Sequence, residues 1–192
     1  FGRTGNWFGS ETFNIKPDLM PMAKGMSSGY LPISAVMVHD RVADVMIAEG
    51  GEFNHGFTYS GHPVAAAVAL ANIEILKREK IVETVGAETG PYLQSRLRQL
   101  ESHPLVGEIR GVGLVAAIEM VKDKANRGLF DPTGEAGTIC RNHCLNNGLI
   151  MRATGDSMLI SPPLIITKKQ IDELVEKAGK CLDMTAKDLT TR

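Results

Sequence analysis

The spacing of hydrophobic positions predicts a helix near the C-terminal end of the chain. Residues 167–170 (TKKQ) have the capping-box pattern that begins helices, and apolar residues then recur every three or four positions. The apolar positions of this predicted helix are Ile171, Leu174, Val175, Ala178 and Leu182. Because these residues share one helical face, we expect the helix to be amphipathic and to cover a core.

Other patterns complete a predicted α+β domain over residues 81–192. Residues 81–102 and 133–147 are predicted helices, the first with weak points at Gly86 and at Gly90 and Pro91. Residues 106–121 alternate between apolar and other positions, which indicates one strand. The apolar face of this predicted strand is formed by Val112, Leu114, Ala116, Ile118 and Met120. Two further short strands are predicted at 149–152 and 158–161.

Residues 1–80 have fewer elements. Residues 18–23 are predicted to form a buried strand and residues 33–39 a second strand. Asp40 is expected to cap a short helix, and residues 63–76 are predicted to form a helix that is buried because it is apolar nearly all round. Two strands are too few to close a sheet, so we expect this part to be incomplete without further chain.

Composition and charge exclude several classes of protein. The 192 residues are 43% hydrophobic and 22% charged, which is typical of globular proteins. The net charge of −1 offers no basic excess for nucleic acid, and no apolar run approaches the ~20 residues of a membrane span. Three cysteines argue against a disulfide scaffold and for a reducing, cytoplasmic compartment.

Two motifs have a structural interpretation that is stronger than a functional one. Residues 111–116 (GVGLVA) fit the dinucleotide fingerprint, but a strand pattern follows the glycines where that fingerprint needs a helix. Cys140 and Cys144 share a helical face with His143 only partly aligned, and no second ligand cluster is present in the sequence. We therefore expect glycines beside a strand, small buried thiols and no metal site.

Lys24 is the residue whose type and position best suit a chemical role. It ends an apolar run and precedes Gly25. An amine desolvated at the end of a buried strand has a lowered pKa, and a neutral amine forms a Schiff base with an aldehyde. Most lysines lie on solvated surfaces, so position alone leaves both interpretations of Lys24 open.

Several segments together resemble class III pyridoxal-phosphate aminotransferases, most closely their ω-amino acid or amine:pyruvate branch. The segments follow the order of the family along essentially the whole chain. They are residues 1–5 (FGRTG), 17–25 (PDLMPMAKG), 29–35 (GYLPISA), 54–63 (NHGFTYSGHP), 110–114 (RGVGL), 151–153 (MRA) and 161–163 (SPP).

The resemblance implies an α/β fold, that of the fold-type I pyridoxal-phosphate transferases. Residues 1–80 would be the C-terminal part of the large cofactor-binding domain, and residues 81–192 the α+β C-terminal small domain. The implied activity moves an amino group from an amine, with diamines such as putrescine included, or from an ω-amino acid to a keto acid such as pyruvate. The cofactor would be pyridoxal 5'-phosphate, and the kinetics would be ping-pong.

The resemblance also implies roles for four residues. Lys24 would hold the cofactor as a Schiff base and act as general base. Thr58 would bind the cofactor phosphate, from the neighbouring subunit in the family, and Phe57 would form a wall of the site. Arg152 would bind a substrate carboxylate, and a flexible turn at residues 154–156 would let it swing away. Their alternatives are a hydroxyl that caps its own turn for Thr58 and a surface salt bridge for Arg152.

The family pattern contains parts that these residues lack. The aspartate that contacts the pyridine nitrogen normally lies a few residues before the position of Phe1, and a phosphate loop and a ring-stacking aromatic lie further upstream. We therefore expect a C-terminal portion whose partners are its own N-terminal half and a further copy, in a homodimer or tetramer. The alternatives are a catalytically incompetent fragment without cofactor and a related pyridoxal-phosphate enzyme such as an aminomutase.

Overall fold

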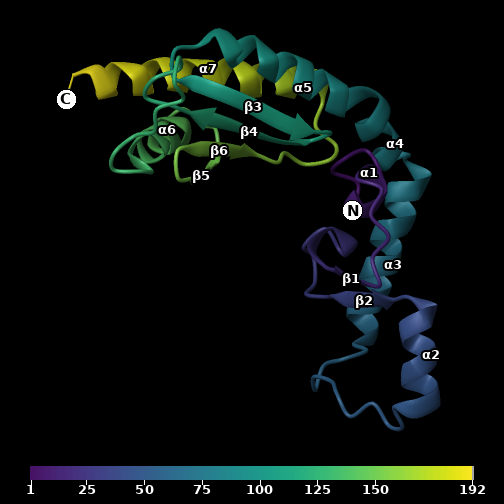
Figure 1. The fold of residues 1–192 in the computed structure, drawn as a ribbon. Coiled ribbons are helices and arrows are strands. Elements are labelled where there is room, and N and C mark those ends of the chain that lie inside the picture. The colour runs from purple at the N-terminus through teal and green to yellow at the C-terminus, as the bar shows by residue number, and fades with distance from the viewer. Residues whose placement is uncertain (192) are drawn as a thin grey trace. The chain divides into compact units, whose positions relative to one another are not determined.

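The computed structural model describes residues 1–191, which divide into two compact units (Figure 1). Unit 1 comprises residues 1–2 and 6–82. Unit 2 comprises residues 3–5 and the chain from Glu83 onward. Within residues 1–191, no helix is both long enough and apolar enough to cross a membrane. Each unit is described by itself below.

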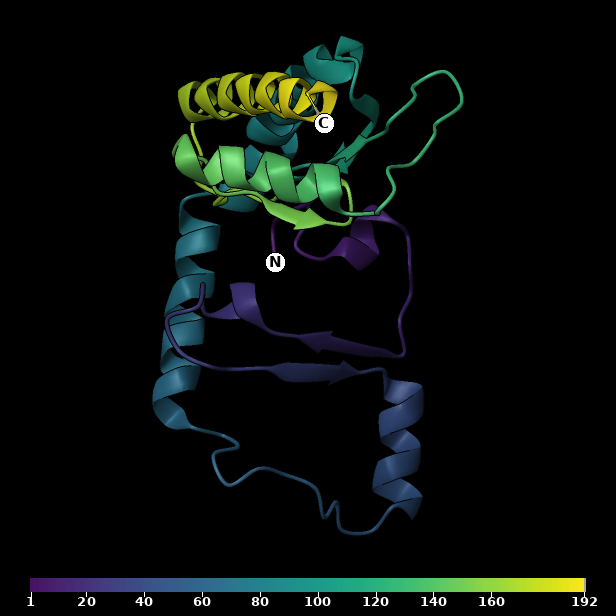
Figure 2. The ribbon, with the colours of Figure 1, turned by 90° about the vertical axis from the view of Figure 1, so that its left-hand side faces the viewer.

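Unit 1 is built around an antiparallel pair of short strands, β1 (Leu19–Met22) and β2 (Ala35–Val38). Its other elements are α1 (Gly9–Thr12), the 3₁₀ turn η1 (Lys24–Met26), α2 (Asp40–Glu49) and α3 (Pro63–Arg78). Figure 2 shows the β1–β2 pair extending between α3 and α2. The two strands and the two longer helices confirm the element types predicted for this part.

The expected burial in unit 1 is wrong. Residues of β1 are exposed or half-buried and all four of β2 are exposed, because two strands leave both faces of the ribbon without a covering layer. Helix α3 buries only Ala65, Ala69 and Leu76, although its sequence is apolar nearly all round. Unit 1 therefore shows large apolar side chains to solvent, such as Met37, Ile47 and Leu70.

Helices α2 and α3 of unit 1 have histidines as N-terminal caps. The predicted cap Asp40 is instead the first residue of α2, and the His39 side chain accepts a hydrogen bond from the Arg41 amide. Pro63 is the first residue of α3, as predicted, and His62 caps that helix through the Ala65 amide. An imidazole nitrogen fills the role that the sequence assigned to a carboxylate, because either accepts from a free amide.

Unit 2 contains one antiparallel sheet of four strands in the order β3-β4-β6-β5. The strands are β3 (Val106–Val112), β4 (Val115–Met120), β5 (Arg152–Thr154) and β6 (Ser157–Ile160). The helical run before the sheet starts with α4 (Ile81–Thr84), which spans the boundary between the units, and continues with a π-helix (Val85–Thr89), α5 (Gly90–Arg98) and the 3₁₀ turn η3 (Gln99–Ser102). The π-helix contains Gly86, one of the two predicted weak points, whereas Gly90 and Pro91, the other, begin the regular helix α5.

Helices cover one face of this sheet. Helices α5 and α6 (Glu135–Asn146) contact strands, and α7 (Lys168–Thr190) packs on both helices, on the same side in Figure 2. Thr167 begins α7 with the predicted capping box, and most of its predicted apolar face is buried. The largest fully buried hydrophobic side chains of this core are Leu93, Leu97, Leu114, Ile118, Met120, Met158, Ile171 and Leu182.

The single strand predicted for 106–121 is wrong, because the segment is a hairpin. Gly113, with φ +56°, and Leu114 form a two-residue turn between β3 and β4. Glycine at the first position of such a turn is typical of tight hairpins. Val112 pairs with the exposed Val115, so Val112 lies on the other face from Ala116. The glycines therefore belong to a hairpin and leave no strand-to-helix turn for a dinucleotide.

Residues 3–5 are seated in unit 2 by close backbone contacts. The Leu114 amide donates to the Arg3 carbonyl at 2.7 Å, and the Arg3 guanidinium donates to the Pro162 carbonyl at 2.8 Å. A Cβ on Gly113 would lie 2.4 Å from the Arg3 carbonyl oxygen. A Cβ on Gly86 would lie 2.8 Å from the Gly5 carbonyl oxygen. Because glycine has no Cβ, positions 86 and 113 allow the backbone of residues 3–5 to approach closely.

Candidate functional site

Lys24 lies on the tight turn that follows strand β1. Its backbone is in the left-handed region with φ +53°, which non-glycine residues adopt rarely and often at functional sites. The side chain is exposed. The expectation that Lys24 ends a buried strand is therefore wrong for this chain, because β1 has no covering layer. Within residues 1–191, no carboxylate forms an ion pair with the Lys24 amine.

The turn after Lys24 is held by a residue that the sequence analysis missed. The Asn72 side chain, on α3, donates to the carbonyl oxygens of Gly25 at 2.9 Å and Met26 at 3.0 Å. Its own oxygen accepts from the Ser28 hydroxyl at 2.7 Å. The sequence contained a signal, because Asn72 is the only polar residue between positions 64 and 73 of an apolar helix.

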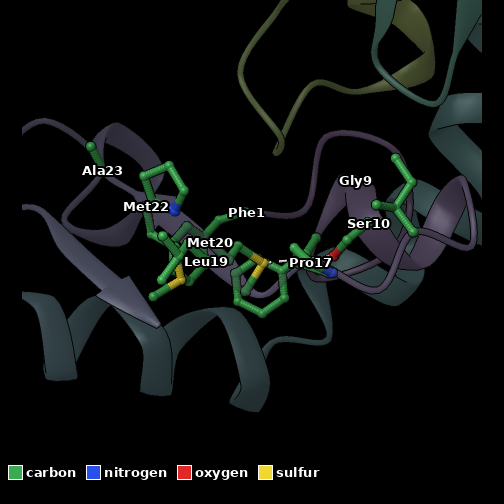
Figure 3. Close-up of a pocket in the computed structure, with 11 residues that line it drawn as sticks. Phe1, Gly9, Ser10, Pro17, Leu19, Met20, Met22 and Ala23 are labelled. Carbon is green, nitrogen blue, oxygen red and sulfur yellow. Dashed lines mark hydrogen bonds between the residues drawn. The ribbon is translucent and has the colours of Figure 1, made fainter. Parts of the chain in front are cut away.

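A hollow of about 350 Å³ lies beside β1 (Figure 3). Its walls come from β1, from Phe1 and Phe8, and from the chain between α1 and β1, and it extends to Ala23, the residue before Lys24. The rings of Phe1 and Phe8 meet edge to face with centroids 5.2 Å apart. The space next to the Lys24 turn is thus mostly apolar, which suits the ring of a bound organic molecule.

Thr58 and Phe57 lie on the exposed loop between α2 and α3. The turn at this place is closed by Ser60, whose amide donates to the Phe57 carbonyl and whose hydroxyl accepts from the Phe57 amide at 2.9 Å. The Thr58 hydroxyl takes no part in closing that turn. His55 lies between the rings of Phe53 and Phe57, at 5.8 and 6.0 Å. In Figure 2 the loop runs past the lower ends of α2 and α3, below the β1–β2 ribbon.

Arg152 begins the edge strand β5 and lies on the face of the sheet that the helices leave open. Cross-strand pairing places Arg110, Ala117, Leu159 and Arg152 in one row across the four strands. Arg110 forms ion pairs with Glu108, at 3.3 Å, and with Glu119. Arg152 is exposed and, among residues 1–191, forms no ion pair. Its guanidinium is therefore available to an external carboxylate.

Asp156 connects the turn next to Arg152, where we expect flexibility, to helix α6. The Asp156 carboxylate accepts from the amides of Gly134 at 2.8 Å and Gly137 at 2.9 Å, at the start of that helix. Asp156 is 9% exposed, and a Cβ on Gly137 would lie 2.0 Å from the Gly155 carbonyl oxygen. These contacts hold the turn next to Arg152 against the start of α6.

Comparison with family models matches residues 1–182 to "Aminotransferase class-III". This chain belongs to the class III aminotransferase family. The family match includes Lys24, Thr58 and Arg152 within its bounds. It confirms the resemblance stated above and the fold-type I α/β architecture expected from it, which solved transaminases share.

Relatives within the family carry the names of transaminases. The chain is 62% identical over 186 residues to a putrescine–pyruvate aminotransferase of Pseudomonas aeruginosa, covering 97% of this chain and 40% of that protein. It is 44% identical over 190 residues to gamma aminobutyrate transaminase 1, mitochondrial, of Solanum lycopersicum, covering 97% of this chain and 37% of the relative.

A solved structure shows the same fold. The crystal structure of the omega transaminase from Pseudomonas jessenii in complex with PMP matches with a TM-score of 0.90 and 43% identity. The match covers 97% of this chain and 42% of that one. The chain therefore spans about two fifths of the length of the relatives that it matches.

The residues present fit part of the cofactor site of a class III aminotransferase. An exposed amine on a left-handed turn, an adjoining apolar hollow and an exposed threonine hydroxyl suit an aldehyde, a ring and a phosphate, respectively. Lys24 and Thr58 lie in unit 1 on separate segments, and no contact joins them. Arg152 belongs to unit 2.

Cys140 and Cys144 are small buried thiols, as expected, and Cys181 is buried as well. Cys140, Cys144 and Cys181 lie between α6 and α7 with 2% exposure or less. A hydrogen bond with Cys140 and burial raise the pKa of the Cys144 thiol, and burial raises the pKa of Cys181. These two thiols therefore stay protonated, unlike metal-bound or nucleophilic cysteines. Residues 1–191 contain no group of histidine, cysteine or acidic side chains placed to hold a metal.

Proposed function

We propose that the protein carrying this chain is a pyridoxal-phosphate-dependent aminotransferase and that Lys24 binds its cofactor. The observation that carries the proposal is the Lys24 amine, exposed on a left-handed turn at the end of β1 in a chain of the class III family. When bound, pyridoxal phosphate supplies an aldehyde that reacts with amines and a ring that accepts electrons from the substrate.

Each residue of the proposed site has a defined task. The Lys24 amine would hold the cofactor aldehyde and, once released, carry a proton to and from the substrate carbon. The Thr58 hydroxyl would donate a hydrogen bond to the phosphate, from a neighbouring copy of the chain, with Phe57 as a wall beside it. The Arg152 guanidinium would hold a substrate carboxylate through two parallel hydrogen bonds.

The proposed substrates are a primary amine or ω-amino acid as donor and a keto acid such as pyruvate as acceptor. A diamine such as putrescine is the donor that we favour, since the 62%-identical relative is named a putrescine–pyruvate aminotransferase. The names of the 44%-identical relatives point to gamma aminobutyrate, an ω-amino acid. Both a diamine and an ω-amino acid could be donors if Arg152 binds a substrate carboxylate and moves aside when a diamine enters. The kinetics would be ping-pong.

The proposal includes a division of labour along the chain. Residues 1–80 would finish the cofactor-binding domain and residues 81–192 would form the small domain. The exposed apolar side chains of β2, α2 and α3 support the need of residues 1–80 for the protein's own N-terminal half and for a second copy. We place this homodimer or tetramer in the cytoplasm, where its free cysteines stay reduced.

Reductive trapping tests the proposal. The protein would be incubated with pyridoxal phosphate, reduced with borohydride, digested and analysed by mass spectrometry. We expect a pyridoxyl group on the peptide that contains Lys24, its loss in Lys24→Ala, and its retention in the control Lys16→Ala. Lys24→Ala should also stop alanine formation from pyruvate and putrescine. An unmodified Lys24 peptide, or full activity in Lys24→Ala, would refute the proposed role.

A further inference from the structure

We propose that Asn72 is a positioning residue for Lys24: its side chain fixes the turn from which the lysine projects. The inference rests on the proposed function, because Lys24 needs a fixed position only if it binds the cofactor. Asn72 itself is on α3, and it contacts the chain at residues 25, 26 and 28, after the lysine. It would act through the backbone of Lys24 and not on the cofactor.

Only one orientation of the Asn72 side-chain amide satisfies all of its hydrogen bonds. The amide nitrogen donates to two consecutive carbonyls, at 2.9 and 3.0 Å, and the amide oxygen accepts from the Ser28 hydroxyl at 2.7 Å. A side-chain amide has two donor hydrogens and one acceptor oxygen, so each part has a partner. Rotation of the amide by half a turn would place an oxygen against two carbonyl oxygens, which is unfavourable.

The turn needs such support because its own backbone is strained. Lys24 and Ser28 have φ of +53° and +49°, in the left-handed region that is unfavourable for residues with a Cβ. The backbone-to-backbone hydrogen bonds within residues 23–28 are long, at 3.3 Å from Met26 to Ala23 and 3.4 Å from Ser28 to Gly25. The bonds from Asn72 are shorter than these and come from outside the turn.

Asn72 lies on the face of helix α3 that packs against the turn. Asn72 lies on the stripe of α3 that includes the buried residues Ala65, Ala69 and Leu76. The turn packs against this stripe, with Met26 7% exposed and Ser27 2% exposed. Asn72 itself is half-buried, so water only partly replaces the hydrogen bonds that its side chain makes to the turn.

The chemical consequence concerns the reach of the Lys24 amine. Reacting atoms must come within about 3–3.5 Å in the right orientation, and an error of about 1 Å can lower a rate about 100-fold. The backbone of Lys24 sets the direction in which its side chain leaves the turn. By fixing residues 25, 26 and 28, Asn72 would preset that direction before the cofactor arrives.

The test uses the Asn72→Asp variant of the natural, full-length protein. The aspartate has the same shape and still accepts from Ser28, but it cannot donate to the two carbonyls. The matched control is Glu74→Gln, on the exposed side of the same helix. Two quantities would be measured: amide hydrogen exchange of the peptide covering residues 24–31, and the rate at which borohydride traps pyridoxal phosphate on Lys24.

We expect Asn72→Asp to speed exchange of that peptide and to slow trapping on Lys24, each about tenfold, which corresponds to the loss of about 1.4 kcal/mol. Exchange of the peptide covering α2 should stay unchanged, and Glu74→Gln should match the natural protein in both measurements. If Asn72→Asp does not fold, Ser28→Ala removes only the hydroxyl bond and should change both rates in the same directions by about threefold.

The outcomes separate the inference from the proposed function. Natural exchange in residues 24–31, or a natural trapping rate, in Asn72→Asp would overturn the role of Asn72 and leave the proposed function standing. The same two results in Ser28→Ala would overturn it if that variant has to be used. Absence of any adduct on Lys24 in the natural protein would overturn the proposed function and, with it, this inference.

Discussion

The Asp156 carboxylate accepts a hydrogen bond from the Gly137 amide at 2.9 Å, so a residue of the β5–β6 turn caps a helix that begins about 20 positions earlier. Its second oxygen accepts from the Gly134 amide at 2.8 Å. The negative charge lies at the positive end of the helix dipole, which adds to the hydrogen bonds. This contact fixes the hairpin that carries Arg152.

Removal of the Asp156 cap should destabilise unit 2. We expect Asp156→Ala to lower the free energy of unfolding by about 2 kcal/mol and Asp156→Asn by about 1 kcal/mol, since asparagine retains one acceptor. Denaturant unfolding measures both values. The control Asp183→Asn, at an exposed carboxylate near His103, should change stability by less than about 0.5 kcal/mol. Equal effects of Asp156→Asn and Asp183→Asn would contradict the capping role.

Gly137→Ala tests the same contact from the side of the helix. Alanine normally favours a helix interior over glycine by about 1 kcal/mol. Here the added Cβ would lie 2.0 Å from the Gly155 carbonyl oxygen, so the hairpin must move away from the helix. We therefore expect a loss of stability of about 2 kcal/mol, typical of overpacking. A gain of stability on denaturant unfolding would show that the two segments are not in contact.

Arg152 should affect the keto acid and spare the diamine. Loss of a charged, paired hydrogen bond costs about 1.5–3 kcal/mol, so Arg152→Ala should raise KM for pyruvate about 10- to 100-fold. KM for putrescine, which has no carboxylate, should stay within about twofold. Steady-state kinetics with each substrate varied gives both values. Arg110→Ala is the matched control in the same row of the sheet, and equal losses for both substrates would remove Arg152 from the site.

Thr58 should govern retention of the cofactor. Thr58→Ala removes the proposed donor to the phosphate and should raise the dissociation constant for pyridoxal phosphate about tenfold or more, whereas Thr58→Ser keeps the hydroxyl and should stay near the natural value. Cofactor absorbance after dialysis provides the measurement. Tyr59→Phe, on the same loop, is the control. If Thr58→Ala retains cofactor as well as Thr58→Ser, the threonine has no such role.

Alkaline pH should weaken unit 2 through Tyr92. Its hydroxyl donates to Asp172 at 2.7 Å, and this hydrogen bond raises the pKa of the Tyr92 phenol above its ordinary value. Because the folded state favours the protonated phenol, the resulting stability is present below about pH 10 and is lost as the pH rises through the folded pKa. Arg96 binds the same carboxylate oxygen at 2.7 Å.

The measurement is the melting temperature between about pH 9 and pH 11.5, a window that brackets the ordinary tyrosine pKa. The natural protein should lose more than Tyr92→Phe over this range, because phenylalanine has no proton to release. Tyr59→Phe changes an exposed tyrosine outside unit 2 and should follow the natural curve. Parallel curves for the natural protein and Tyr92→Phe would exclude the contribution.

Prediction from sequence succeeded where local signals agreed with one another. Helix α7 has both a capping box at Thr167 and a steady apolar period, and both appear in the structure. The hairpin was missed because its turn has only two residues, Gly113 and Leu114, and the apolar period continues through it. A glycine followed by a strand-like run was the available signal, and it was interpreted only as a poor dinucleotide motif.

Non-local contacts explain most of what the sequence could not predict in the candidate site. Motif order assigned Lys24, Thr58 and Arg152, but their surroundings depend on distant partners. Asn72 reaches a turn more than 40 positions earlier, and Asp156 reaches back to α6. Burial of β1 was mispredicted for the related reason that apolar composition cannot say whether a covering layer is part of the chain.

The hydrogen bonds that hold residues 3–5 in unit 2 can form only after later residues of that unit have been synthesised. The Arg3 guanidinium donates to the carbonyl of Pro162, 159 positions later in the chain, and the Arg3 carbonyl accepts from the Leu114 amide. At about 5–20 residues per second, a ribosome delivers position 162 roughly 10–30 s after position 3. Residues 3–5 can therefore take their place in unit 2 only after about 160 further residues have been made, and by then the chain of unit 1 between positions 6 and 82 is complete. The speed of translation between positions 3 and 162 thus sets how long residues 3–5 remain without their hydrogen bonds to unit 2.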